Sequence, residues 1–85
     1  MNKLDDVMVN KELSNVSKML YSYMFKATGD DEVIITLDGF ERMYASVVTD
    51  AEKSAAECFD ELLSKGLFAV NAEQDDGVIV YRLIR

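Results

Sequence analysis

Apolar residues between Thr49 and Phe68 recur at the spacing of an α-helix. Offsets of three and four place them on one face of a helix of about four turns: Ala51, Ala55, Cys58, Phe59 and Leu62. Thr49 or Asp50 is placed to cap the start of this helix. Gly66 is placed to end it, because glycine adopts the left-handed conformation at little cost and Lys65 suits the negative end of the helix dipole.

Two further helices are predicted upstream. The first follows Asn10, a candidate N-cap, and places these residues on a wide apolar stripe: Leu13, Val16, Met19, Leu20, Tyr23, Met24 and Ala27, with Tyr21 and Phe25 to one side. The second spans Phe40–Val48, and its apolar residues are again three and one apart: Phe40, Met43, Tyr44, Val47 and Val48. Thr36 is placed to cap this second helix, with Asp38 in its first turn.

Three short segments favour extended structure. Val33–Thr36 is β-branched at every position, which favours a strand. Phe68–Ala72 and Val78–Ile84 are two more strands, and the Asp-Gly pair in the Glu73–Gly77 segment between them is a strong signal for a hairpin. Gly29 ends the first helix ahead of an acidic loop, Asp30–Glu32. Residues 1–9 show no regular period, so we expect a flexible arm or a segment that packs on a partner subunit.

The order helix, strand, helix, helix, hairpin, with LLSKGLF leading into the hairpin, resembles the winged helix-turn-helix family. The similarity covers most of the chain and is to small regulators and replication-initiator-type domains. It implies an α+β fold of three helices, a short strand and a C-terminal β-hairpin wing, in one domain over residues 1–85. It also implies that Thr49–Phe68 contains the recognition helix. The family's turn before that helix commonly has the pattern Gly-apolar-Ser, whereas Ser46–Asp50 is longer and has no glycine.

Composition is that of an ordinary folded domain, with 49% hydrophobic and 29% charged residues in 85. No apolar run reaches about 18 residues, so we expect no membrane segment. Asp5 and Asp6 stand where a signal peptide would need a basic and then apolar stretch, and this favours a cytoplasmic location. The single cysteine, Cys58, cannot form an internal disulfide, and its place on an apolar face predicts a core residue rather than a reactive thiol.

Catalysis is not expected from this set of residues. The chain has no histidine, no paired Ser/Lys or Cys/His set and no glycine-rich phosphate loop. The acids at Asp30–Glu32 and Asp75–Gly77 lack the alternation of a calcium loop. We therefore predict a protein that is not an enzyme and that needs no cofactor or metal.

The net charge of −7 has the wrong sign for a protein that neutralises a nucleic-acid backbone. Acids occupy most of the positions that would face DNA in this family: Glu52, Glu57 and Asp60 on the recognition helix, and Glu73, Asp75 and Asp76 at the wing tip. These six residues are the candidates for binding a basic protein surface, with the acids imitating the charge of DNA.

The alternative hypothesis is a dimeric DNA-binding regulator or replication-initiator-like domain. Its candidate contacts are Lys53, Ser54, Arg42 and Arg82, with Lys11, Lys18 and Arg85 as further scattered bases. Under either hypothesis we expect a homodimer, because the N-terminal segment and the first helix offer more apolar surface than one small core absorbs.

Overall fold

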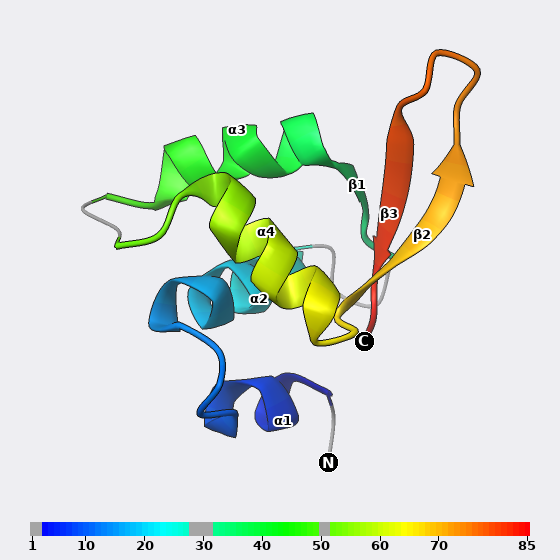
Figure 1. Cartoon of the computed structure of the whole chain (residues 1–85). Coiled ribbons are helices and arrows are strands. Elements are labelled where there is room, and N and C mark those ends of the chain that lie inside the picture. The colour runs from blue at the N-terminus through cyan, green and yellow to red at the C-terminus, as the bar shows by residue number, and fades with distance from the viewer. Residues whose placement is uncertain (1–2, 28–31, 50–51) are drawn as a thin grey trace.

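The computed structural model describes residues 3–27, 32–49 and 52–85, which form four α-helices and three β-strands (Figure 1). The helices are α1 (Lys3–Val9), α2 (Asn15–Ala27), α3 (Leu37–Val47) and α4 (Ala55–Ser64). The strands are β1 (Ile34–Thr36), β2 (Phe68–Glu73) and β3 (Ile79–Leu83). The predicted α+β class is confirmed, whereas the prediction of three helices is wrong, since the described residues form four.

The strands make one antiparallel sheet in the order β1-β3-β2. Ile35 pairs with Tyr81 on one side of β3, and Val70 pairs with Tyr81 on the other. The turn between β2 and β3 projects away from the helices, as Figure 1 shows. Gly77 has a φ of 85° in that turn, so the predicted Asp-Gly hairpin is confirmed.

A cluster of aromatic rings joins the helices to the sheet. Phe59 of α4 stacks on Phe68 of β2 at 4.9 Å between ring centroids and meets the edge of Tyr81 at 4.8 Å. Phe40 of α3 packs against Phe59 at 5.2 Å. Cys58 is fully buried beside this cluster, and burial raises the pKa of its thiol. The predicted core position of the cysteine is therefore confirmed.

The N-terminal segment is a helix, where the sequence suggested an irregular arm. Val7 of α1 is only 2% exposed, and α1 packs against α2. The helical spacing of apolar residues is hard to detect here, because α1 has seven residues and a single fully buried side chain. A helix this short depends on tertiary contacts rather than on its own propensity.

Helix α4 begins later than predicted. Its N-cap is Ser54, so the prediction that Thr49 caps the helix is wrong; Asp50 and Ala51 lie outside the described residues. The connection between α3 and α4 therefore extends beyond Ser46–Asp50, the segment that the sequence analysis compared with the turn of the winged-helix family. At the other end Gly66 has a φ of 73°, which confirms it as the residue that ends the helix.

The predicted N-cap of α3 is confirmed, whereas the predicted N-cap of α2 is wrong. The Thr36 hydroxyl accepts a hydrogen bond from the Gly39 N–H, as expected for an N-cap. For α2 the capping hydroxyl belongs to Ser14, which accepts the Ser17 N–H. The predicted cap, Asn10, instead accepts from the Glu12 N–H in the preceding turn.

The buried face of α2 is rotated from the predicted stripe. Leu20, Tyr21 and Met24 are buried, while Met19 is 44% and Tyr23 is 51% exposed. Tyr21 faces inward because its hydroxyl donates to the Ile84 carbonyl at 2.6 Å. This rotation leaves two large apolar side chains on the outside of α2. The predicted loop residues Gly29, Asp30 and Asp31 lie outside the described residues, and none of the described helices is long and apolar enough to cross a bilayer.

Candidate interaction surfaces

Glu57, the first acidic residue of α4, also takes part in capping the helix. The Glu57 carboxylate accepts the Ser54 N–H at 3.0 Å, and the Ser54 hydroxyl accepts the Glu57 N–H at 3.2 Å. The hydrogen bonds that the Glu57 carboxylate accepts from Ser54, first from its backbone N–H and then from its side chain, hold the pKa of Glu57 below its usual value. Asp60 is exposed one turn later, whereas Cys58, Phe59 and Leu62 on the other side are buried. Glu57 and Asp60 therefore place negative charge on the outer side of α4.

Glu52 is separated from this helix. It precedes Ser54 in the connection from α3 and is exposed there. It lines a cavity against α2 together with Lys53. The structure therefore does not place Glu52 on α4, where the sequence analysis expected it.

The other predicted acids lie at the tip of the hairpin. Glu73 is the last residue of β2, and Asp75 and Asp76 follow in the exposed turn. The Asp76 carboxylate accepts the Val78 N–H at 3.0 Å, so it also stabilises the turn. Glu73 and Asp75 are exposed, with no Lys or Arg within 4 Å among the residues that the structure describes.

Three cations of the DNA-binding alternative, Arg42, Lys53 and Arg82, each lie beside a carboxylate. Arg42 is 2.7 Å from Asp38, one turn earlier on α3. The Lys53 ammonium is 3.6 Å from Glu61, and the Arg82 guanidinium is 3.6 Å from Glu32. The fourth candidate, Ser54, is engaged as the cap of α4. The structure thus places an acid beside each of these three cations.

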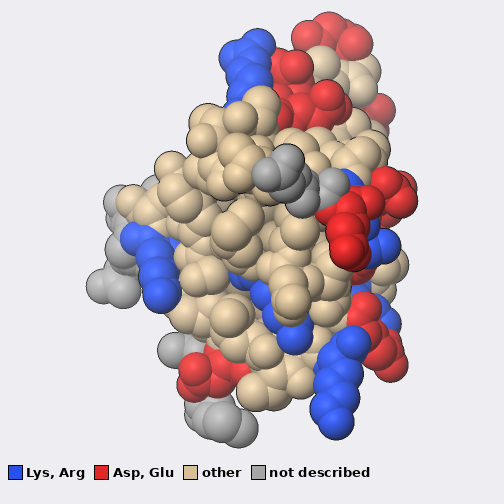
Figure 2. Space-filling model, turned by 90° about the vertical axis from the view of Figure 1, so that its left-hand side faces the viewer, with Lys and Arg blue, Asp and Glu red and all other residues tan. Residues whose placement is uncertain are grey.

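The distribution of charge is uneven on the face shown in Figure 2. Asp and Glu gather at the upper end and, together with Lys and Arg, along the right-hand side, next to a broad central area of mostly uncharged residues. The exposed apolar residues of α1 and α2 are Met8, Val9, Met19 and Tyr23. These four residues make up the second candidate surface.

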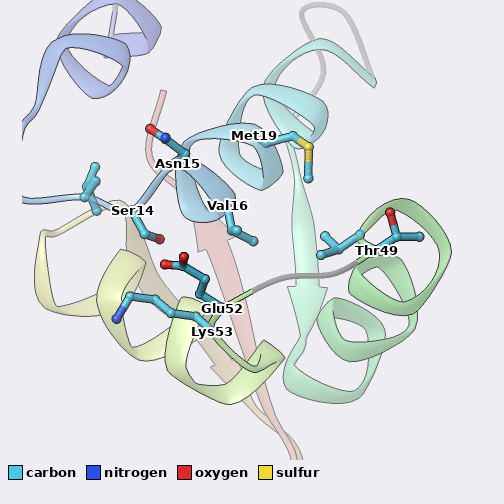
Figure 3. A pocket seen from close by; sticks show the side chains of 9 residues that line it. Ser14, Asn15, Val16, Met19, Thr49, Glu52 and Lys53 are labelled. Carbon is cyan, nitrogen blue, oxygen red and sulfur yellow. The ribbon is translucent and has the colours of Figure 1, made fainter.

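A cavity of about 540 Å³ separates α2 from the connection between α3 and α4. Figure 3 shows Val16 and Met19 projecting from α2 toward the segment that contains Thr49, with Glu52 and Lys53 beside Ser14. Met19 also borders two further hollows, one with Tyr23 and Lys26 and one with Met8. Sequence reasoning found the residues of this surface but assigned Met19 and Tyr23 to the core.

A partly buried carboxylate binds two residues that line this cavity, Ser14 and Lys53, and the sequence did not reveal it. Glu61 of α4 is 15% exposed and accepts the backbone N–H of Ser14, just before α2. Burial is the largest influence on its pKa and raises it, but hydrogen bonds from Ser14 and Ser17 and the charge of Lys53 together bring the pKa below its usual value. Glu61 thus holds α4 against the start of α2. Ser14 and Glu61 are 47 positions apart, so no local pattern in the sequence indicated this hydrogen bond.

No group of three or more His, Cys, Asp or Glu residues suited to a metal ion occurs in the described ranges. Comparison of the chain with protein-family models, with curated proteins and with solved structures finds no match.

Proposed function

We propose that this chain is a regulatory module of the winged-helix type that acts without catalysis, by binding a basic protein surface. The order α2, β1, α3, α4, β2, β3 supports this, because it is the order that the resemblance implies. In this proposal α4 corresponds to the recognition helix and the β2–β3 hairpin to the wing. Helix α1 is then an addition before the shared elements.

One observation favours a protein partner over DNA. Three of the cations proposed as DNA contacts, Arg42, Lys53 and Arg82, each lie within 4 Å of a carboxylate. Asp60, Glu73 and Asp75 are exposed with no such partner among the described residues. DNA affinity depends on cations that replace the counterions of phosphates, so this surface repels a duplex.

A basic protein would gain from the same arrangement. Opposite potentials across an interface raise the rate of encounter and fix the register of binding. Carboxylates on a helix and on a projecting hairpin would present negative charge at two separate places, as a nucleic-acid backbone does. The proposed mechanism is therefore competition with nucleic acid for the basic surface of a partner.

The test compares two probes: a random 20-base-pair duplex and a synthetic peptide of about 20 residues rich in Lys and Arg, both at about 50 mM salt. Fluorescence anisotropy should show binding to the peptide that weakens steeply with added salt, and little binding to the duplex. Tight duplex binding with a steep salt slope would instead establish the DNA-binding alternative.

A matched pair of variants locates the binding surface. Asp60→Asn with Asp75→Asn removes two charges from the proposed face, and Asp6→Asn with Glu41→Gln removes two from α1 and α3. We expect about tenfold weaker peptide binding for the first pair and less than about twofold for the second. Equal losses of affinity in the two double variants would mean that only the net charge of the protein matters. They would contradict binding of the peptide at α4 and the hairpin.

A further inference from the structure

Helix α2 has an outward row of side chains in addition to its buried face. Val16, Met19, Tyr23 and Lys26 follow one another at offsets of three, four and three, the spacing of a helix that packs along another helix. Met19 and Tyr23 are about half exposed, although both are large and apolar. Small polar residues, Asn15 and Ser22, flank the row. The row therefore has the pattern of a packing seam without a partner in the described chain.

This face has a projecting side chain and hollows beside it. Met19 stands between three hollows, and the hollow beside Tyr23 and Lys26 lies further along the same helix. An identical copy turned by a two-fold rotation therefore presents the same hollows to a side chain that projects from the first copy. Methionine is suited to such a contact because its flexible side chain fills irregular gaps and its sulfur packs well on aromatic rings.

The charges on this face select the direction of packing. Lys26 lies at the C-terminal end of the row, and Glu52 lines the cavity at the N-terminal end beside Val16. Lys18 lines the hollow between Met8 and Met19. Lys53, next to Glu52, already faces Glu61. Two copies in parallel would set Lys26 against Lys26 and Glu52 against Glu52. Two antiparallel copies bring each lysine to the glutamate of the other copy.

We propose that a second copy of this chain binds here, with the two α2 helices antiparallel about a two-fold axis near Ser22. Met19 of each copy packs on Tyr23 of the other, and Lys26 pairs with the other copy's Glu52. A closed, isologous contact of this kind is the commonest form of homo-oligomer. The proposal is independent of the proposed function, since it uses a different surface from Asp60 and the hairpin tip.

The charge of the surface agrees with this occupant, and the area of a stable interface indicates how many residues must take part. A stable interface buries about 800 Å² per partner, about a seventh of the chain's 5344 Å². A helix of 13 residues is about 20 Å long, so α2 needs help from Met8 on one side and Val48 on the other. Because each copy has a net charge of −7, association requires a contact poor in acids. Glu52 is the one carboxylate among the described residues that line the three hollows around Met19.

Sedimentation velocity from about 1 μM to about 100 μM tests the dimer, and we expect a dissociation constant within that range. Lys26→Glu and Glu52→Lys should each weaken the dimer at least tenfold, and the double variant should return to within about threefold of the original. A monomer at the highest concentration, or a charge swap that does not restore association, would overturn the proposal.

Cross-linking gives an independent readout of the geometry. Ser22→Cys lies nearest the proposed axis and should form a disulfide-linked dimer under mild oxidation, whereas Asn71→Cys, exposed on β2, should not. The native Cys58 is fully buried and does not interfere. Equal cross-linking at both positions, or none at Ser22→Cys, would contradict an antiparallel α2 contact. Circular dichroism of each variant establishes that it is folded.

Discussion

Ser54 and Glu57 bind each other's backbone at the start of α4. The side chain of each accepts a hydrogen bond from the N–H of the other, at 3.2 Å and 3.0 Å. Such a capping box satisfies two N–H groups that a helix otherwise leaves without a partner. It determines where α4 begins, and so it also determines that Glu52 and Lys53 lie outside the helix.

Replacing Ser54 with alanine should therefore destabilise the protein. Loss of an N-cap side chain costs about 1 kcal/mol, and chemical denaturation should show this as a lower midpoint with an unchanged slope. Ser64→Ala is the matched control, because Ser64 is exposed and its hydroxyl donates only to the Glu61 carbonyl in the same helix. Equal effects of the two substitutions would mean that the box does not stabilise α4.

The aromatic cluster should be the most sensitive part of the core. Phe59 contacts Phe40, Phe68 and Tyr81 and is 3% exposed, so Phe59→Ala removes the central ring. Such a substitution costs about 3–5 kcal/mol, a large share of the stability of a small domain. Tyr81→Phe keeps the ring and should cost less than about 1 kcal/mol. Urea unfolding of both variants makes the comparison.

Tyr21 should make the protein sensitive to alkali. Burial raises the pKa of its hydroxyl from 10.0 to about 12, although the nearby charge of Arg85 lowers it. A phenol whose pKa is raised in the folded state stabilises that state below pH 10, and this contribution is lost as the pH rises toward 12. Tyr21→Phe should lose about 1 kcal/mol at pH 7 with its hydrogen bond to Ile84. The difference from the original protein should shrink above pH 10.

Local patterns in the sequence predicted most of the elements. The β-branched run at Val33–Thr36, the Thr36 cap and the Asp-Gly turn each depend on neighbouring residues, and each was confirmed. The start of α4 was also available locally, since Ser54 and Glu57 have the spacing of a capping box. The prediction failed there because Thr49 and Asp50 are equally good capping residues by type.

Contacts between distant residues could not be predicted in the same way. Tyr21 faces inward because its hydroxyl donates to the carbonyl of Ile84, 63 positions away. The periodicity of apolar residues in α2 gives no indication of this hydrogen bond. Of the ion pairs at the candidate DNA contacts, only Asp38 with Arg42 has a local spacing. The pairing of Lys53 with Glu61 and of Arg82 with Glu32 depends on the tertiary fold. The candidate residues could be chosen from the sequence, but not their electrostatic surroundings.

The carboxylate of Glu61 should account for part of the protein's response to acid. The pKa of Glu61 is lowered from 4.5 in the folded state, so its contribution to stability is present above about pH 4.5 and is lost as the pH falls below that value. Glu61→Gln keeps an oxygen that can accept the Ser14 N–H but removes the charge beside Lys53. Glu61→Ala removes the acceptor as well and should cost about 1–3 kcal/mol at pH 7, more than the glutamine variant.

Glu12 and Glu57 also have lowered pKa values, from hydrogen bonds to Lys65 and Ser54 respectively, so the original protein sums all three responses. The stability of the original protein minus that of Glu61→Gln isolates Glu61, because the other two carboxylates are common to both chains. Thermal unfolding from pH 7 to pH 3 should show this difference constant above pH 5 and shrinking below about 4.5. A difference that stays constant to pH 3 would mean that Glu61 acts through its shape and its hydrogen bond alone, and not through its charge.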